Sequence, residues 1–151
     1  MLKSILVGAL LTMATVGIHA IGTTWWIRRL QRLRESTLDP NRPLIQLRVL
    51  CSTAVVLLLL HILEVAVWAC VYMALPDLAE LSEIEEATYF STVTFATLGY
   101  GDVVINGSWR LLSAIQAMTG LLIFGWSTAL LYAVVQRLWG DTQPSRQTSA
   151  L

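Results

Sequence analysis

The chain has 151 residues, of which 56% are hydrophobic and 13% are charged, and its mean hydropathy is +0.65. Because an average soluble domain has about 25% charged residues, this composition predicts one small membrane domain. The formal net charge is zero and the arginines gather near the ends of apolar runs, which argues against a nucleic-acid partner.

Three apolar runs are each long enough to cross a membrane as a helix. They extend from about Ser4 to Trp26, from about Val49 to Leu75, and from about Leu111 to Leu138. Four tryptophans lie at the edges of these runs, where amphipathic rings favour the membrane interface. They are Trp25, Trp26, Trp109 and Trp139.

The first run also fits a cleaved signal peptide loosely, because Lys3 precedes an apolar stretch that ends near Ala20. Cleavage would leave two spans and put the basic connection outside, so we expect residues 1–27 to be a retained helix. Its small residues Ala14, Gly17 and Gly22 would let it pack closely on the second run. It lacks an arginine at every third position, so it is not expected to sense voltage.

The connection over residues 28–48 is strongly basic and contains Pro40 and Pro43. Only Lys3 precedes the first run, so positive charge predicts that this connection is cytoplasmic. The N-terminus would then lie outside, and the tail over residues 140–151 would lie in the cytoplasm. The arginines of the connection are Arg28, Arg29, Arg32, Arg34, Arg42 and Arg48.

His61 and Glu64 interrupt the second run, and a spacing of three places them on one helix face. A carboxylate at membrane depth is costly and normally faces protein or water. Two interpretations stay open. Glu64 could be a proton-sensitive latch on the following short helix through Ser91 or Thr94, or the pair could be a buried contact that only stabilises the fold. Two ligands are too few for a metal site.

Two cysteines fall on the same predicted helix, Cys51 and Cys70. At 1.5 Å per residue they are about 28 Å apart, so they cannot form a disulfide within the chain.

An acidic stretch follows the second run, which Pro76 is expected to end. Ser82 and Glu85 form a capping-box pattern, which predicts a short helix reaching about Ala96. Its dipole would place partial negative charge at its C-terminus, just before residue 97. The acidic residues either concentrate cations near this segment or belong to an ordinary exposed loop. They are Asp77, Glu80, Glu83, Glu85 and Glu86, with Asp102 beyond the short helix.

Residues 97–102 read Thr97, Leu98, Gly99, Tyr100, Gly101 and Asp102. Backbone carbonyls that point at an axis can replace the hydration shell of a cation without fixed charge. Pointing successive carbonyls one way needs alternating backbone handedness, which glycine adopts at no steric cost. Gly99 and Gly101 stand at such alternate positions, so the segment predicts an ion filter. The Thr97 hydroxyl could add an oxygen at its inner end, and Tyr100 would point away from the axis.

The stretch from Leu75 to Arg137 therefore resembles the pore domain of tetrameric potassium channels with one pore loop per subunit. The family filter reads TVGYG, and this chain has Leu98 in place of the valine. The resemblance implies four subunits around one axis, with K⁺ held by carbonyls of Thr97, Leu98, Gly99 and Tyr100.

In the third run Gln116, Gly120 and Ser127 fall on one helix face, which we expect to line an inner cavity. Gly120 and Gly125 resemble the glycines at which inner helices of this family bend during gating. Close helix packing explains these two glycines equally well.

These observations predict an all-α membrane protein with three transmembrane helices, a re-entrant short helix and a filter loop, its pore domain covering residues 49–139. The expected function is a homotetrameric, potassium-selective channel of the cell membrane. We expect no enzyme activity, no small-molecule substrate and no cofactor beyond permeant K⁺; the partners are further copies of the chain and membrane lipid. The alternatives are a non-selective cation channel, if Leu98 alters the filter, or a non-conducting accessory subunit.

Overall fold

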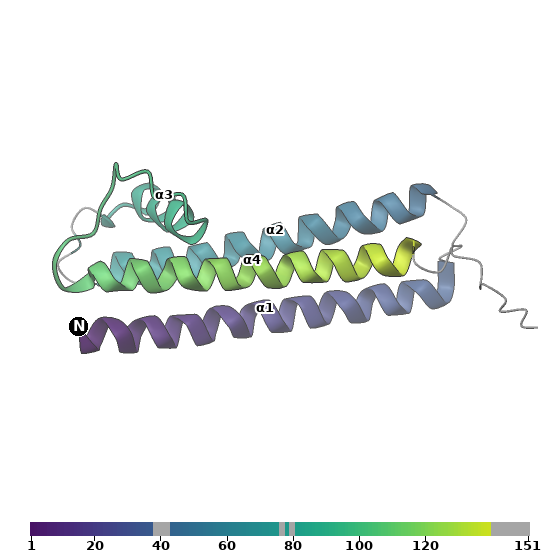
Figure 1. The fold of residues 1–151 in the computed structure, drawn as a ribbon, viewed down its shortest axis with the longest axis horizontal. Coiled ribbons are helices and arrows are strands. Elements are labelled where there is room, and N and C mark those ends of the chain that lie inside the picture. The colour runs from purple at the N-terminus through teal and green to yellow at the C-terminus, as the bar shows by residue number, and fades with distance from the viewer. Residues whose placement is uncertain (38–42, 76–77, 79–80, 140–151) are drawn as a thin grey trace, which may run out of the picture.

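The computed structural model describes residues 1–37, 43–75, 78 and 81–139, without the side chains of 33–37 and 139. Every regular element in these ranges is helical: α1 (Leu2–Thr37), α2 (Pro43–Ala74), α3 (Ile84–Phe95), the 3-10 turn η2 (Gly107–Trp109) and α4 (Arg110–Trp139). The three long helices run alongside one another, and the short α3 lies against one end of them (Figure 1). The predicted all-α fold is therefore confirmed.

Three segments are long and apolar enough to cross a membrane, namely Leu2–Arg32, Pro43–Ala74 and Gly107–Leu138. They agree with the three predicted runs, but α1 and α2 extend well into the basic connection. Arginine is a good helix former, and proline is tolerated at a first helical position, where Pro43 stands. Hydropathy marks only the part of a helix that prefers lipid, so it underestimates the length of α1 and α2. Pro40, Arg42 and Pro76 lie outside the described residues.

One face of α2 is buried although the helix is apolar all round. Its buried side chains recur every three or four residues, whereas Leu58, Leu59 and Ile62 remain exposed. This spacing is that of a single helix face. The buried positions are Thr53, Leu57, His61, Glu64, Val65, Trp68, Ala69 and Tyr72.

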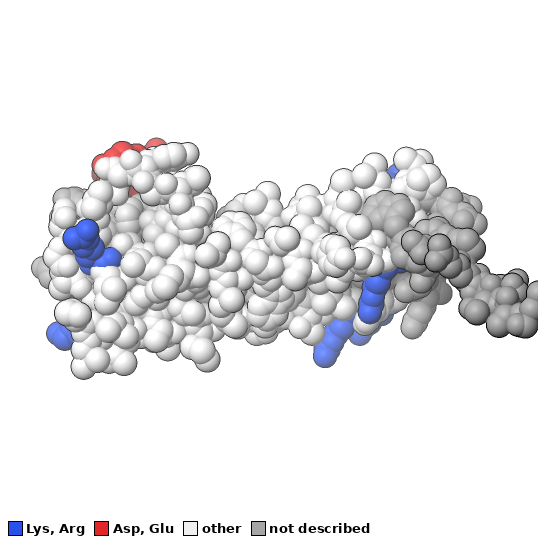
Figure 2. All heavy atoms as spheres, viewed as in Figure 1, with Lys and Arg blue, Asp and Glu red and all other residues white. Residues whose placement is uncertain are grey.

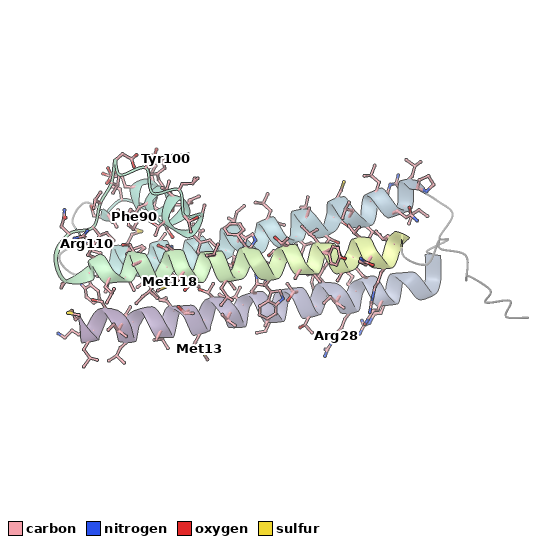
Figure 3. The ribbon with its side chains drawn as sticks, in the orientation of Figure 1. Met13, Arg28, Phe90, Tyr100, Arg110 and Met118 are labelled. Atoms are coloured by element: carbon pink, nitrogen blue, oxygen red, sulfur yellow. The ribbon has the colours of Figure 1, made fainter. Side chains whose placement is uncertain are left out.

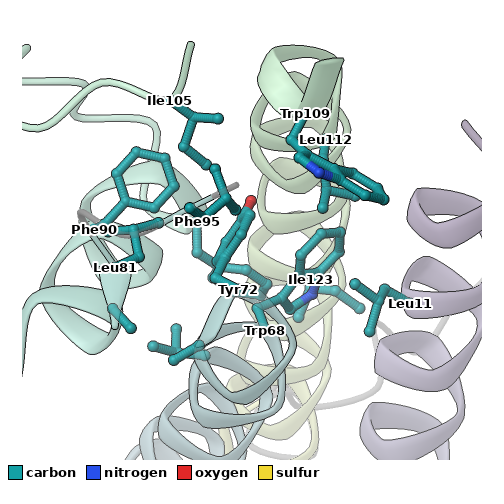
Figure 4. Packing of buried hydrophobic residues seen from close by; sticks show 14 residues of the cluster. Leu11, Trp68, Tyr72, Leu81, Phe90, Phe95, Ile105, Trp109, Leu112 and Ile123 are labelled. Carbon is teal, nitrogen blue, oxygen red and sulfur yellow. The ribbon is translucent and has the colours of Figure 1, made fainter. Parts of the chain in front are cut away.

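Aromatic side chains fill the space where α3 meets the long helices (Figure 4). Trp68 and Tyr72 of α2 are fully buried. The ring of Tyr72 meets that of Phe90 on α3 edge-on, with 5.2 Å between the ring centroids. Leu112 and Ile123 of α4 close the cluster, and Leu11 brings α1 into it. Burying this much aromatic surface fixes α3 against α2 and α4.

Two of the tryptophans predicted at the membrane interface are instead buried in the protein. The Trp26 indole N–H donates to the Thr53 hydroxyl at 3.0 Å, and Trp109 joins the core. The indole N–H at the end of a span can donate to a neighbouring helix as well as to a lipid headgroup. The position of a tryptophan in the sequence therefore does not decide whether it faces the membrane interface or the protein core. Trp25 is 57% exposed; the side chain of Trp139 lies outside the described residues.

Glycines bring α1 close to its neighbours at two points. A Cβ on Gly22 would lie 2.4 Å from a methyl carbon of Leu60, and one on Gly8 would lie 2.7 Å from Ile115. Close packing at Gly22 is therefore confirmed. Gly17 has nothing within 4 Å of a built Cβ, and Ala14 is exposed, so the prediction was wrong for these two.

Charged residues gather toward the two ends of the bundle (Figure 2). The acidic surface lies over α3, and most of the basic surface lies at the opposite end. Arg28 marks that opposite end, and Arg110 lies near α3 (Figure 3). The stretch between the ends carries little charge on this face, as a lipid-exposed surface requires.

Candidate functional site

The start of α3 differs from the predicted capping box. The N-cap is Glu83 rather than Ser82, and its side chain makes no capping hydrogen bond. Ser82 stands one residue outside the position from which a hydroxyl reaches the first free amides. Glu85 and Glu86 still lie in the first turn, where negative charge favours the helix dipole.

The end of α3 passes directly into the 97–102 segment through a Schellman motif. The N–H of Thr97 donates to the Thr94 carbonyl at 3.0 Å, and the N–H of Leu98 donates to the Val93 carbonyl at 2.9 Å. Glycine usually fills the left-handed position of this motif, but here Thr97 has φ of 58°. For a residue with a Cβ this costs about 1–2 kcal/mol. The sequence pattern predicted left-handed glycines and missed this threonine.

Backbone handedness alternates along the segment. Gly99 has φ of 56° and Gly101 has φ of 81°, as predicted, whereas Leu98 and Tyr100 do not have positive φ. A Cβ built on either glycine meets nothing within 4 Å. The glycines are therefore required by backbone conformation rather than by space. Such alternation is the pattern that turns successive carbonyls to one side.

A side-chain hydrogen bond holds the far end of the segment. The Tyr89 hydroxyl on α3 donates to Asp102 Oδ2 at 2.6 Å. This bond raises the pKa of Tyr89 and lowers the pKa of Asp102. Tyr100 lies on the loop beyond α3, away from the long helices, and is 66% exposed (Figure 3). The segment is thus tied to α3 at both ends.

A family model described as an ion channel, Ion_trans_2, matches residues 52–137, more than half of the chain. The chain belongs to this ion-channel family. The matched range begins in α2, includes α3 and the 97–102 segment, and ends in α4. Comparisons with curated proteins and with solved structures gave no match. The protein is a multi-pass membrane protein with an ion-channel pore domain, and the family is not one of enzymes.

A buried hydrogen-bond chain joins the three helices of the channel domain. The Tyr72 hydroxyl donates to Gln116 Oε1 at 2.9 Å, and Gln116 Nε2 donates to Ser91 Oγ at 2.6 Å. Ser91 Oγ in turn donates to the Val65 carbonyl at 3.0 Å. Gln116 is fully buried, so the prediction that it lines a cavity was wrong. Hydropathy showed a polar face on α4 but not that this face turns toward α2 and α3.

Gly120 lets α4 approach the end of α3. A Cβ there would lie 1.9 Å from the Phe95 carbonyl oxygen, so no other residue fits without a backbone shift. Close packing therefore explains Gly120, which does not line a cavity. Gly125 has nothing within 4 Å of a built Cβ. Bending of the channel's inner helix at either glycine stays a prediction.

Glu64 contacts histidines rather than α3. Its two carboxylate oxygens lie 2.9 Å from His19 Nδ1 and 3.2 Å from His61 Nδ1. Because both carboxylate oxygens face histidines and Ser91 bonds Val65 and Gln116, the predicted latch from Glu64 to α3 through Ser91 or Thr94 is wrong. Sequence reasoning missed His19, although a histidine within an apolar run carries the same signal as His61. Ser127 also turns inward, to the two histidines, and is 5% exposed.

The acidic residues can be placed only in part, because Asp77 and Glu80 lie outside the described residues. Glu83, Glu85, Glu86 and Asp102 are all exposed. Red surface gathers over α3 in Figure 2. Both cysteines of the channel are free, as their separation predicted.

Proposed function

We propose that this channel conducts K⁺ selectively through the backbone carbonyls of Thr97, Leu98, Gly99 and Tyr100. The observation that carries the proposal is the alternation of positive φ at residues 97, 99 and 101, in a segment held at both ends by α3. Carbonyl oxygens match the hydration shell of a large monovalent cation and carry no net charge that would bind it too tightly.

We propose further that the channel is a homotetramer. One strand presents its carbonyls from one side only, so several copies must surround an axis to coordinate an ion. Leu98 and Tyr100 are more than half exposed in the single chain, as are Leu121 and Leu122 on α4. These surfaces are available to other subunits and to lipid. The resemblance to channels with one pore loop per subunit supports four copies.

Electrostatics supports entry of cations at the end where α3 lies. Exposed Glu85, Glu86 and Asp102 would be repeated in every subunit and would raise the local cation concentration. The same end would face outward, because Arg28, Arg29 and Arg32 lie toward the other end of α1 and favour the cytoplasm. An epitope at the N-terminus should therefore be accessible on intact cells, and one at the C-terminus should not. The reverse pattern would contradict this orientation.

Flux from liposomes tests conduction. Liposomes loaded with K⁺ or with Na⁺ are reconstituted with the purified channel, and loss of each ion is followed. We expect rapid K⁺ loss and little Na⁺ loss, and Gly101→Ala should abolish both because φ of 81° is unfavourable for alanine. Gly107→Ala is the matched control, since Gly107 has φ of 72° and open space but lies outside the segment.

Two results would favour the alternatives. Equal loss of K⁺ and Na⁺ would indicate a non-selective channel, and recovery of selectivity by Leu98→Val would assign that property to Leu98. No flux from a correctly assembled oligomer would indicate an accessory subunit.

A further inference from the structure

A compact polar cluster lies at mid-length between α1, α2 and α4, next to the end of α3, where the ring centroids of His61 and Phe95 are 6.2 Å apart. It consists of His19 on α1, His61 and Glu64 on α2, and Ser127 on α4. His19 and Glu64 are fully buried, and Ser127 is 5% exposed. His61, whose side chain is 11% exposed, is the most exposed of the four. His19 and His61 are both of the histidines in the chain.

The donor atoms converge at distances suited to a metal ion. His19 Nδ1 and His61 Nδ1 lie 2.9 Å and 3.2 Å from separate oxygens of Glu64. Ligand atoms from all three residues lie within 4.8 Å of one another. With metal–ligand bonds near 2.0–2.2 Å, tetrahedral ligand atoms are about 3.3–3.6 Å apart. Small movements would therefore bring the three groups into coordination.

Ser127 supplies the second argument, through the count of protons. Its hydroxyl oxygen lies 3.3 Å from His19 Nε2 and 3.1 Å from His61 Nε2. If both Nδ1 atoms carry protons and donate to Glu64, both Nε2 atoms are acceptors, and the hydroxyl has one proton for the two of them. One contact is then lone pair against lone pair.

A metal ion on the Nδ1 side removes this conflict. Each neutral ring then carries its proton on Nε2, and the two lone pairs of Ser127 Oγ accept both hydrogen bonds. Ligating histidines characteristically donate their other ring N–H in this way. One extra proton, on a ring or on the Glu64 carboxyl, would also remove the conflict. It would leave Glu64 hydrogen-bonded rather than coordinated, so a metal-binding experiment separates a bound metal ion from a bound proton.

We propose that His19, His61 and Glu64 bind one divalent transition-metal ion per subunit, with Zn²⁺ the best match. Two imidazoles and one carboxylate are a zinc donor set, leaving a fourth position for water. Aromatic rings flank the site. The ring centroid of Phe124 is 4.6 Å from that of His61, and the ring centroid of Trp126 is 5.5 Å from that of His19. Because α1 lies outside the family match, the ion fastens this additional helix to the pore domain.

Cobalt substitution tests the site directly. The full-length channel, purified without a histidine tag and with Cys51→Ser and Cys70→Ser to remove exposed thiols, is stripped with a chelator and titrated with Co²⁺ in lipid nanodiscs. We expect the intense visible bands of tetrahedral Co²⁺, one ion per subunit, and displacement of Co²⁺ by Zn²⁺. Because binding rather than conduction is measured, this result is independent of the proposed function.

Variants separate coordination from a structural role. His19→Asn should abolish the bands, and Ser127→Ala should keep them while weakening affinity about 10–100-fold. Thr128→Val is the matched control on the exposed side of α4 and should change nothing. If His19→Asn does not fold, His19→Cys should bind Co²⁺ with a new thiolate charge-transfer band.

Absence of tetrahedral bands in the unmodified channel, or bands that persist in His19→Asn, would overturn the proposal. If the unmodified channel binds no metal and its unfolding free energy instead depends on pH in a way that needs both histidines, the cluster holds a proton and the proposal is overturned.

Discussion

At the scale of single residues, Thr97 occupies a backbone conformation that glycine normally fills. The Schellman bonds from Thr97 and Leu98 to α3 hold it there, at a cost of about 1–2 kcal/mol. Strain of this size persists where the surroundings over-determine the backbone, and it is concentrated at functional sites. Under the proposed function, the Thr97 hydroxyl would add an oxygen in line with the backbone carbonyls, and a glycine has no side chain to supply that oxygen.

Tyr89 should control the far end of the same segment. Tyr89→Phe removes the hydrogen bond to Asp102, so we expect a lower K⁺/Na⁺ permeability ratio in bilayer recordings. Asp102→Asn keeps an acceptor oxygen and should have the smaller effect. An unchanged ratio in Tyr89→Phe would show that this bond does not hold the filter.

The pH range of this bond follows from the two pKa shifts. The hydrogen bond from Tyr89 holds the pKa of Asp102 below its ordinary 3.8, so its stabilisation is present above that value and is lost as pH falls through the lowered pKa. The pKa of Tyr89 is raised above 10.0, so its contribution is present below 10.0 and is lost as pH rises through the raised pKa. Selectivity that depends on this bond should therefore be constant between these limits.

At the scale of elements, the crossing of α4 over the end of α3 depends on Gly120. Gly120→Ala places a Cβ against the Phe95 carbonyl, and overpacking of this kind typically costs about 1–3 kcal/mol. We expect a lower melting temperature of the assembled channel and loss of current. Gly125→Ala meets no atom within 4 Å and should be neutral, or stabilising by up to about 1 kcal/mol. Equal effects of the two changes would contradict this explanation.

The chain of hydrogen bonds through Gln116 should be cooperative. Gln116→Leu leaves the buried Tyr72 hydroxyl without its acceptor, which costs about 1–3 kcal/mol. Adding Tyr72→Phe removes the orphaned hydroxyl, so the double variant should lose less stability than the sum of the single variants. A denaturant unfolding series on the four proteins measures this, and strict additivity would show that the two residues are not coupled.

The same elements show what the sequence can predict. Hydropathy placed all three long helices and the glycine spacing indicated two of the left-handed residues, because both signals are local. Which face of a uniformly apolar helix is buried is set by its neighbours, so Gln116, Ser127 and Trp26 were assigned to the wrong surroundings. A histidine within an apolar run could have marked His19 as unusual, but its partner Glu64 is 45 residues away on another helix, so no local pattern could pair the two.

At the scale of the whole molecule, the protein is an ion-channel pore domain with one additional helix. The family match begins within α2, and α1 packs along α2 and α4 through Gly22 and Gly8. Ser4 and Thr12 also bond the chain at Ser108 and Thr119, so α1 contacts the α4 region from its first turn onward. This helix is therefore an integral part of the helix bundle rather than a loosely attached anchor.

The most direct test of the central claim is the reversal potential of the purified channel in a planar bilayer with K⁺ on one side and Na⁺ on the other. The proposed carbonyl filter predicts a reversal potential near the limit set by K⁺, and loss of that current in Gly101→Ala but not in Gly107→Ala. A reversal potential near zero in the unmodified channel would contradict selectivity for K⁺ over Na⁺.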